Sequence, residues 1–342
     1  MSPDTHSLTA GIAIEVLDGV TPGAFAKILA QATQPILLRG LVADWTAVKC
    51  GLVSDEELTA YLGQFYAGAT VNMFSGEPEI DGRFFYNEDM TGFNFARSRE
   101  KFDQVLDQLS RQTNSATSQS FYVGATTIDN CLPGFTVENT VEFGDIDPLT
   151  SIWVGNRTRI AAHYDLPDNL ACVVAGHRRF TLFPPEQMAN LYPGPLDFTP
   201  AGQQISLVDF HKPDLERYPL FKQALESAMI VDMAPGDAIF IPSMWWHHVE
   251  SLDSLNILVN YWWRKSPAYM GPPADVLLHA LLSLRDLPPE QKKAWAGIFE
   301  HYIFSQDTPL EHIPAASQGF LGPLDETRAR KLRATLLSRL NR

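Results

Sequence analysis

The sequence predicts a mainly β protein with flanking helices, in which an all-β barrel or sandwich of jelly-roll plan forms the core. From residue 121 to residue 264, many short β-rich runs alternate with turns, a spacing typical of jelly rolls. The residues before this part mix helical and strand patterns, and those after it are helical. A chain of 342 residues has ample length to bury such a core.

Composition indicates a globular protein of a reducing compartment. Hydrophobic residues make up 45% and charged residues 19% of the chain, which is not a disordered composition. No apolar run approaches the roughly 18 residues that a spanning helix needs, and residues 1–6 lack the pattern of a signal peptide. Cys50, Cys131 and Cys172 are few, odd in number and widely spaced, so we expect free thiols, a cytoplasmic location and no membrane association.

The net charge is −14, from 40 acidic and 26 basic residues. This charge repels phosphate backbones, so we expect no nucleic-acid partner. A basic peptide or protein is compatible with it. Solubility alone is an equally good explanation of an acidic surface.

Residues 1–10 are expected to form a loose tail, and residues 11–119 an N-terminal elaboration of mixed helices and strands. Thr21 and Pro22 combine a capping residue with proline at the first helical position, which predicts a helix. Ser54 and Glu57 form a capping box that predicts a second helix. The other expected elements are strands at 35–40, 71–74 and 83–86, a third helix at 102–109 and a polar loop at 112–119.

The core is expected between about residues 120 and 265, within one domain that covers residues 11–265. After an opening run at 121–124, strands are predicted at 151–154, 159–163, 169–175, 179–183, 203–208, 229–233, 238–241 and 255–263. Residues 193–202 form a loop rich in proline and glycine, and such loops often border functional sites.

Residues 266–342 are expected to be a helical dimerisation region. Helices are predicted at 274–284, from Pro289 onward and at 325–340, each with an apolar stripe. The barrel is complete by about Arg264, so these stripes need another surface. We expect the matching helices of a second copy, which gives a homodimer; the flank of the chain's own barrel is the alternative.

Two separated stretches carry candidate metal ligands. His163 and Asp165 lie two residues apart on a predicted strand and so point to the same face. A histidine from the stretch 242–248 would complete two imidazoles and one carboxylate, the facial triad that holds non-haem Fe(II) with open coordination positions. The adjacent His247 and His248 point to opposite faces, so only one can be this ligand. The alternative is an ordinary surface pair or a hydrogen-bonded buried histidine.

These stretches resemble the JmjC or cupin-8 family. The resemblance rests on His163-Tyr164-Asp165, on the run from Gly176 to Pro185, on Pro235-Gly236-Asp237 with Ile241-Pro242, and on Trp245-Trp246-His247. It covers roughly residues 12–265. The family implies a double-stranded β-helix that uses Fe(II), 2-oxoglutarate and O2. It places the third ligand directly after the aromatic pair, which makes His163, Asp165 and His247 the expected metal ligands and catalytic residues.

The resemblance also implies four residues that bind 2-oxoglutarate. Arg178 lies fifteen residues after His163, where the family's asparaginyl hydroxylases have a lysine for the distal carboxylate of the cosubstrate. Arginine keeps the charge and changes the geometry. Tyr122 matches a tyrosine that donates to the same carboxylate, and Asn169 and Asn260 match two asparagines that line the cosubstrate. A surface arginine and a core tyrosine are the alternatives, and Arg179 is expected to be the surface arginine.

The chain departs from the asparaginyl hydroxylases, the members that it otherwise resembles most, at three places. Ile160 replaces a cosubstrate-binding threonine, Gln204-Ile205 stands where those enzymes hold the target amide with an Arg-Gln pair, and Gly124 replaces a glutamine. Cosubstrate binding survives these changes, but asparagine is not the expected target.

We therefore expect a 2-oxoglutarate-dependent dioxygenase that hydroxylates a protein or peptide side chain and releases succinate and CO2. One alternative is a JmjC-type N-methyl-lysine demethylase. Others are a metal-binding cupin of another reaction class and a non-catalytic sensor.

Overall fold

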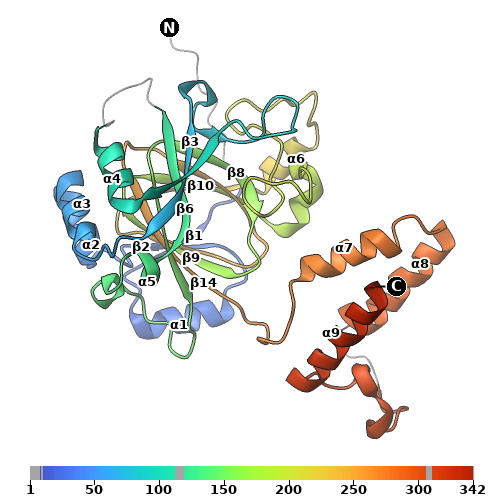
Figure 1. The fold of residues 1–342 in the computed structure, drawn as a ribbon. Helices are drawn as coiled ribbons and strands as arrows, with labels where there is room; N and C mark the ends of the chain where they lie inside the picture. Colours follow the sequence, from blue (N-terminus) through green and yellow to red (C-terminus); the bar gives the residue numbers. More distant parts are fainter. Residues whose placement is uncertain (1–7, 9–10, 112–118, 306–309, 342) are drawn as a thin grey trace. The chain divides into compact units, whose positions relative to one another are not determined.

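A computed structural model describes residues 8, 11–111, 119–305 and 310–341. The chain divides into two compact units, residues 1–264 and 265–342 (Figure 1). The expected tail at 1–10 and the expected loop at 112–119 lie almost entirely outside the described residues.

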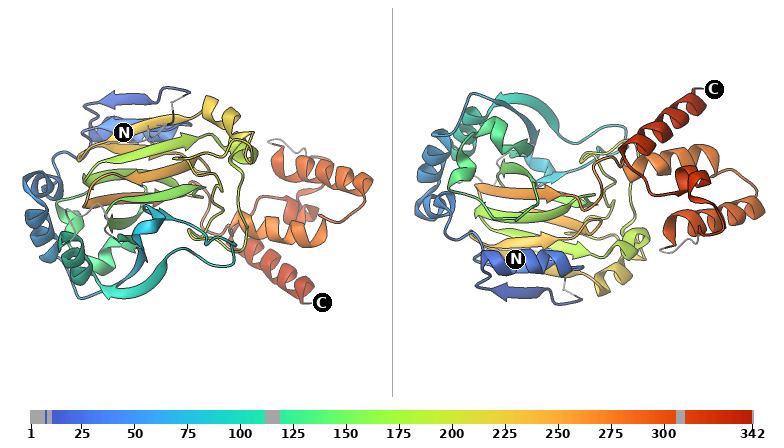
Figure 2. Two further views of the ribbon diagram at one scale, coloured as in Figure 1. Left: turned by 90° about the horizontal axis from the view of Figure 1, so that it is seen from above. Right: turned by 90° about the horizontal axis from the view of Figure 1, so that it is seen from below.

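The first unit is built on two facing β-sheets (Figure 2). The larger sheet has the strand order β1-β2-β12-β9-β14-β7-β6-β3-β5, and the smaller has the order β11-β10-β13-β8-β4. The strands of the larger sheet are β1 (Glu15–Asp18), β2 (Ile36–Arg39), β3 (Thr70–Gly76), β5 (Ala96–Lys101), β6 (Ser120–Thr127), β7 (Leu149–Gly155), β9 (Asp168–Ala175), β12 (Ala238–Ile241) and β14 (Asn256–Trp263). Those of the smaller sheet are β4 (Arg83–Phe84), β8 (Thr158–Tyr164), β10 (Arg178–Phe183), β11 (Met229–Met233) and β13 (Trp246–Ser251). The prediction of a jelly-roll core with added helices is confirmed.

Side chains of the larger sheet alternate between two apolar cores. On β9, Leu170, Cys172 and Val174 belong to one buried cluster, whereas Ala171 and Val173 belong to another. The first cluster lies against the helices, and the second lies between the two sheets and contains Phe180 and Leu182 of β10. Strands buried on both faces read as continuous apolar runs, and every residue of β9 is buried.

Helices cover the outer face of the larger sheet. They are α1 (Pro22–Gln31), α2 (Thr46–Val53), α3 (Asp55–Gly63), α4 (Phe102–Arg111) and α5 (Ile128–Cys131). Both predicted helices form. α1 begins at Pro22 as expected, although the Thr21 side chain makes no capping hydrogen bond. At the start of α3 the Ser54 hydroxyl accepts a hydrogen bond from the Glu57 N–H. The sequence reading missed α2, together with strands β1 and β5.

A second layer covers the outer face of the smaller sheet. It contains a 3-10 segment (Pro185–Leu191), the loops that follow it and α6 (Phe221–Glu226). Phe210 and Phe221 pack there with Trp246 of β13 and Phe183 of β10.

The predicted strand at 203–208 is wrong. The segment forms only two isolated bridges, His163 to Ile205 and Pro193 to Ser206. The buried Ser206 hydroxyl donates to the Leu191 carbonyl, and Val208 N–H donates back to that hydroxyl. These side-chain bonds replace a regular ladder.

The second unit consists of α7 (Pro273–Ser283), α8 (Pro289–Phe299) with a π-helical extension (Glu300–Phe304), two 3-10 turns (Ala315–Ser317 and Gly319–Leu321) and α9 (Glu326–Leu340). Among its described residues only Gly322 and Ala329 are buried. Throughout the described part of the chain, no helix is both long and apolar enough to cross a membrane.

Candidate metal centre

Three predicted ligands meet between the two sheets. His163 on β8 lies directly opposite His247 on β13, and their ring centroids are 4.4 Å apart. Asp165 follows the last residue of β8, and its Oδ2 lies 3.7 Å from His247 Nε2. One ligand atom from each of the three residues lies within 4.8 Å of the others. Two imidazoles and one carboxylate at this spacing fit the facial donor set of non-haem Fe(II).

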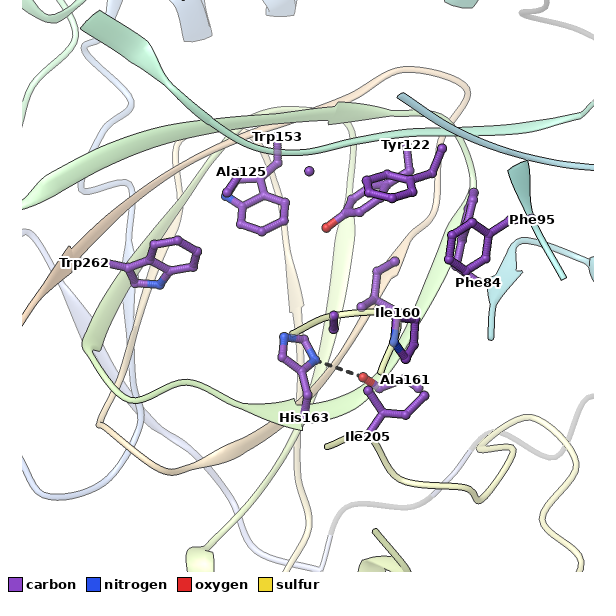
Figure 3. Close-up of a pocket in the computed structure, with 14 residues that line it drawn as sticks. Phe84, Phe95, Tyr122, Ala125, Trp153, Ile160, Ala161, His163, Ile205 and Trp262 are labelled. Atoms are coloured by element: carbon purple, nitrogen blue, oxygen red, sulfur yellow. Dashed lines mark hydrogen bonds between the residues drawn. The ribbon is translucent and has the colours of Figure 1, made fainter. Parts of the chain in front are cut away.

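Backbone carbonyls fix the orientation of both imidazoles. His163 Nδ1 lies 2.9 Å from the Ala161 carbonyl oxygen (Figure 3), and His247 Nδ1 lies 3.0 Å from that of Trp245. A carbonyl only accepts, so each Nδ1 carries the proton and each Nε2 keeps its lone pair for a metal. Burial and the nearby His163 lower the pKa of His247 to about 4, so this ring is neutral at pH 7, as a ligand must be.

A β-bulge in β8 changes which side chains of this strand face the cavity. His247 pairs with His163, but Val249 pairs with Ile160, so Ala161 and Ala162 together face the single residue His248. Without the bulge, Ile160 and His163 would lie on opposite faces, because they are three residues apart. With it, both line the same cavity.

His248 points to the face opposite His247, as strand alternation predicts, but it is buried and not exposed on the surface. It points away from the metal ligands into the second layer, where its ring lies 4.7 Å from that of Phe210. It is buried and neither ring nitrogen has a hydrogen-bond partner. Burial lowers the pKa of this imidazole to about 4, so it is a neutral core residue.

A cavity of about 260 Å³ opens beside His163 (Figure 3). Its walls are mostly aromatic and aliphatic, and the rings come from both sheets. The side chains that line it include Phe74, Phe84, Phe95, Tyr122, Trp153, Trp262, Ile160 and Ile205. Pro200 and Ala201 contribute from the loop at 193–202, which therefore borders the site as predicted.

Arg178 is a buried cation without a counterion. It opens β10 and is 4% exposed, whereas Arg179 on the outer face pairs with Asp232 at 2.7 Å. No ion pair joins Arg178 to any described residue, and its buried Nε has no hydrogen-bond partner. Burial lowers its pKa to about 10, so it stays charged at pH 7. An unpaired buried charge is costly, and a carboxylate ligand would remove that cost.

Tyr122 directs its hydroxyl into the cavity (Figure 3). Burial raises the pKa of this phenol, and Arg178 is close enough to act against the rise. The phenol is therefore a hydrogen-bond donor at any ordinary pH. Its hydroxyl bonds to no described residue and is free to donate to a ligand. Arg178, whose charge acts on this phenol, is buried but is not among the residues that line the cavity.

Asn260 and Asn169 face the space between the sheets but do not line the cavity. Asn260 Oδ1 accepts from Trp153 Nε1 at 2.7 Å, and its amide donates to Asn169 Oδ1 at 3.4 Å. Trp153 lines the cavity, so these hydrogen bonds link the two buried amides to the cavity wall. The sequence reading missed this residue; its signal was an inward-facing tryptophan on a strand that pairs with β14.

The departures from the asparaginyl hydroxylases lie at the cavity. Ile160, Ile205 and Gly124 all line it, and Gln204 is turned away to donate to the Gly194 carbonyl at 2.7 Å. No amide side chain reaches the cavity wall among the described residues.

Comparison with known proteins settles the family. The family model described as a cupin-like domain matches residues 22–269. The chain belongs to the cupin-like family that includes the JmjC proteins. It is 37% identical over 130 residues to lysine-specific demethylase JMJ31 of Arabidopsis thaliana, covering 37% of this chain and 23% of that protein. It is 30% identical over 175 residues to HSPB1-associated protein 1 of Homo sapiens, covering 50% and 35%.

A third cupin-like relative is similar over more of its length. Jumonji C domain-containing protein 5 of Drosophila melanogaster is 26% identical over 262 residues, covering 75% of this chain and 61% of that protein. In all three cases the match spans less than two thirds of the relative. The family match ends at residue 269, so α7, α8 and α9 lie outside it.

Proposed function

We propose that this protein is an Fe(II)- and 2-oxoglutarate-dependent dioxygenase that hydroxylates a side chain of a protein or peptide. The cupin-like family and the triad support an oxygenase of this general type. The identity of the reaction is our own inference.

The observation that carries the proposal is the buried guanidinium of Arg178, which has no ion-pair partner among the described residues and whose charge acts on the Tyr122 phenol. A metal-binding cupin that takes no dicarboxylate has no use for a buried guanidinium without a counterion. Fe(II) would be held by His163, Asp165 and His247. The distal carboxylate of 2-oxoglutarate would accept hydrogen bonds from Arg178 and Tyr122.

When bound, iron, 2-oxoglutarate and O2 together supply the oxidising chemistry, which yields succinate, CO2 and one oxygen atom inserted into a C–H bond. The chain's own residues do the rest. The Ala161 and Trp245 carbonyls hold the two imidazoles, while Arg178 and Tyr122 orient the cosubstrate. The aromatic walls exclude water and position the target beside His163.

The cavity favours hydroxylation of an uncharged side chain over N-demethylation of lysine. None of the described lining residues carries a carboxylate, so a methylammonium group would be buried without an ion pair. The relative JMJ31 is named as a lysine-specific demethylase, which keeps demethylation as the second candidate. The aromatic rings are the feature that would favour it.

The decisive experiment is anaerobic addition of Fe(II) and 2-oxoglutarate, followed by exposure to air. We expect a visible charge-transfer band before air and succinate afterwards, with Arg178→Met deficient in both. Mass spectrometry of a peptide library should then show a gain of one oxygen. Metal binding without the band would favour another cupin reaction class, and the band without succinate would favour a non-catalytic sensor.

The three cysteines are free, and we retain a cytoplasmic location as part of the proposal.

A further inference from the structure

The strand β5 carries three cations beside the cavity. Arg97, Arg99 and Lys101 alternate along it, and all three are exposed. Their register with β3 is Phe74 opposite Arg97, Asn72 opposite Arg99 and Thr70 opposite Lys101. Residues opposite one another in a ladder share a face, so the cations lie on the face that bears Phe74, a residue of the cavity wall.

Arg97 connects this row of charges to the cavity. Its guanidinium carbon lies 5.4 Å from the ring centroid of Phe74 and 5.5 Å from that of Phe95, and both rings line the cavity. Arg99 and Lys101 continue the row away from the cavity for about 13 Å of extended strand. We call Arg97, Arg99 and Lys101 the β5 cation row.

The β5 cation row has no acidic ion-pair partner in the described part of the chain. No ion pair joins its members to the described residues; Arg99 donates to the Thr70 hydroxyl at 2.9 Å, and Arg97 lies over aromatic rings. In a chain of net charge −14, three cations on one face of a strand are a local reversal of charge. The Glu100 carboxylate of the same strand belongs to the opposite face.

We propose that the β5 cation row binds an acidic segment of the substrate polypeptide, next to the residue that enters the cavity. This inference rests on the proposed function and adds the class of substrate to it. A peptide whose target side chain reaches past Phe74 runs over the exposed face of β5. Acidic residues within roughly six positions on one side of the target lie within reach of the cations. The net charge of the chain is compatible with a basic peptide. The local positive charge beside the cavity instead favours an acidic one.

Binding of labelled peptides tests this without turnover. The probes are fluorescein-labelled peptides with a common neutral centre and a flank of four Glu, four Gln or four Lys residues, measured by anisotropy in low salt. The Glu peptide should bind about tenfold more tightly than the Lys peptide, because single exposed ion pairs are weak but three act together. Added salt should reduce the difference.

The triple variant Arg97→Gln, Arg99→Gln, Lys101→Gln should bring the Glu peptide to the affinity of the Gln peptide. A matched control removes three other exposed cations, Lys49→Gln, Lys212→Gln and Lys222→Gln, and should leave the preference intact. Equal binding of the Glu and Lys peptides, or a preference unaffected by the triple variant, would overturn the inference. In that case the cations act only to protect an edge strand from aggregation.

The two proposals fail separately. Peptide binding needs neither iron nor 2-oxoglutarate, so a charge preference without succinate formation would overturn the proposed function alone. Succinate formation coupled to neutral or basic peptides would overturn the acidic-substrate inference alone.

Discussion

The buried charge of Arg178 leads to predictions about both the thermal stability of the protein and its affinity for 2-oxoglutarate. Because its charge is buried without a counterion, Arg178→Met should raise the Tm of the cosubstrate-free protein by about 2–6 °C. The same change should weaken 2-oxoglutarate binding by about 10- to 150-fold, the equivalent of one charge-assisted hydrogen-bonded pair. Differential scanning calorimetry with and without 2-oxoglutarate measures both effects, since a ligand stabilises only the state that it binds.

Arg179→Met is the matched control. It removes the half-exposed partner of Asp232 and should leave the 2-oxoglutarate-dependent rise in Tm unchanged. If both variants lost that rise equally, Arg178 would not be the carboxylate ligand.

His247 and His248 provide a second comparison at the residue scale. His247→Ala, like His163→Ala or Asp165→Ala, should lower metal affinity by more than about 100-fold, beyond the effect of losing a supporting residue. His248→Leu should keep the metal and fold with unchanged or higher stability. Its ring nitrogens make no hydrogen bonds, and the Glu250 carboxylate, 3.9 Å from Nε2, faces a neutral ring. Equilibrium dialysis with Mn(II) measures the bound metal. Loss of binding in His248→Leu alone would reverse the assignment of the third ligand.

Strand alternation explains which side chains could be placed from the sequence. It placed His163 and Asp165 on one face, and these two residues do meet at the candidate metal centre. The choice of Arg178 over Arg179 came from the family resemblance. Strand alternation also separated His247 from His248, but the burial of His248 was beyond its reach. His248 is buried against Phe210, which lies 38 residues earlier in the sequence. The periodicity of one strand cannot predict a contact with such a distant residue.

At the scale of elements, the missed and mistaken strands share a cause. β5 reads Ala-Arg-Ser-Arg-Glu-Lys and has no apolar face; only its pairing with β3 makes it a strand. Residues 203–208 have a strand-like pattern, but the Ser206 hydroxyl bonds locally instead. The bulge in β8 is equally invisible, because it is a property of register between two strands. The bulged strand and the segment at 203–208 contribute Ile160 and Ile205 to the cavity wall, so the wall was harder to predict than the ligands.

The loop at 193–202, which borders the cavity, is held by contacts with the segment from Tyr86 to Phe93, and these contacts can be tested. The Tyr86 hydroxyl donates to the Phe198 carbonyl at 2.6 Å, and the rings of Phe93 and Phe198 stack at 4.7 Å. Tyr86→Phe removes one hydrogen bond worth about 0.5–1.5 kcal/mol. Amide hydrogen exchange in residues 196–202 should therefore accelerate by about two- to tenfold.

Tyr66→Phe serves as its control, because Tyr66 makes a similar bond to the Ala69 carbonyl at 2.9 Å. It should leave exchange at 196–202 unchanged. Unchanged exchange in Tyr86→Phe would mean that the stacked rings alone hold the loop.

At the scale of the whole molecule, the described residues of the second unit form no apolar core of their own. Its helices leave large apolar side chains exposed, including Leu282 at 79% and Trp295 at 42%. Apolar surface of this extent indicates an interaction site. We propose that a second copy of the chain covers it, since a two-fold axis places the same stripe against itself. An interface of about 1,600 Å² with Trp295 near its centre would suffice for a stable pair.

Sedimentation equilibrium at micromolar concentration tests the homodimer. The expected species has twice the chain mass of 38.1 kDa. Trp295→Asp with Ile298→Asp should convert it to the monomer, because burying two carboxylates at the interface costs several kcal/mol in each subunit. Both side chains are exposed within the chain itself, so the variant should fold. Val53→Asp, which alters an exposed apolar residue at the end of α2, should remain dimeric. A wild-type mass of 38.1 kDa would instead mean that the helices α7, α8 and α9 cover a surface of their own chain.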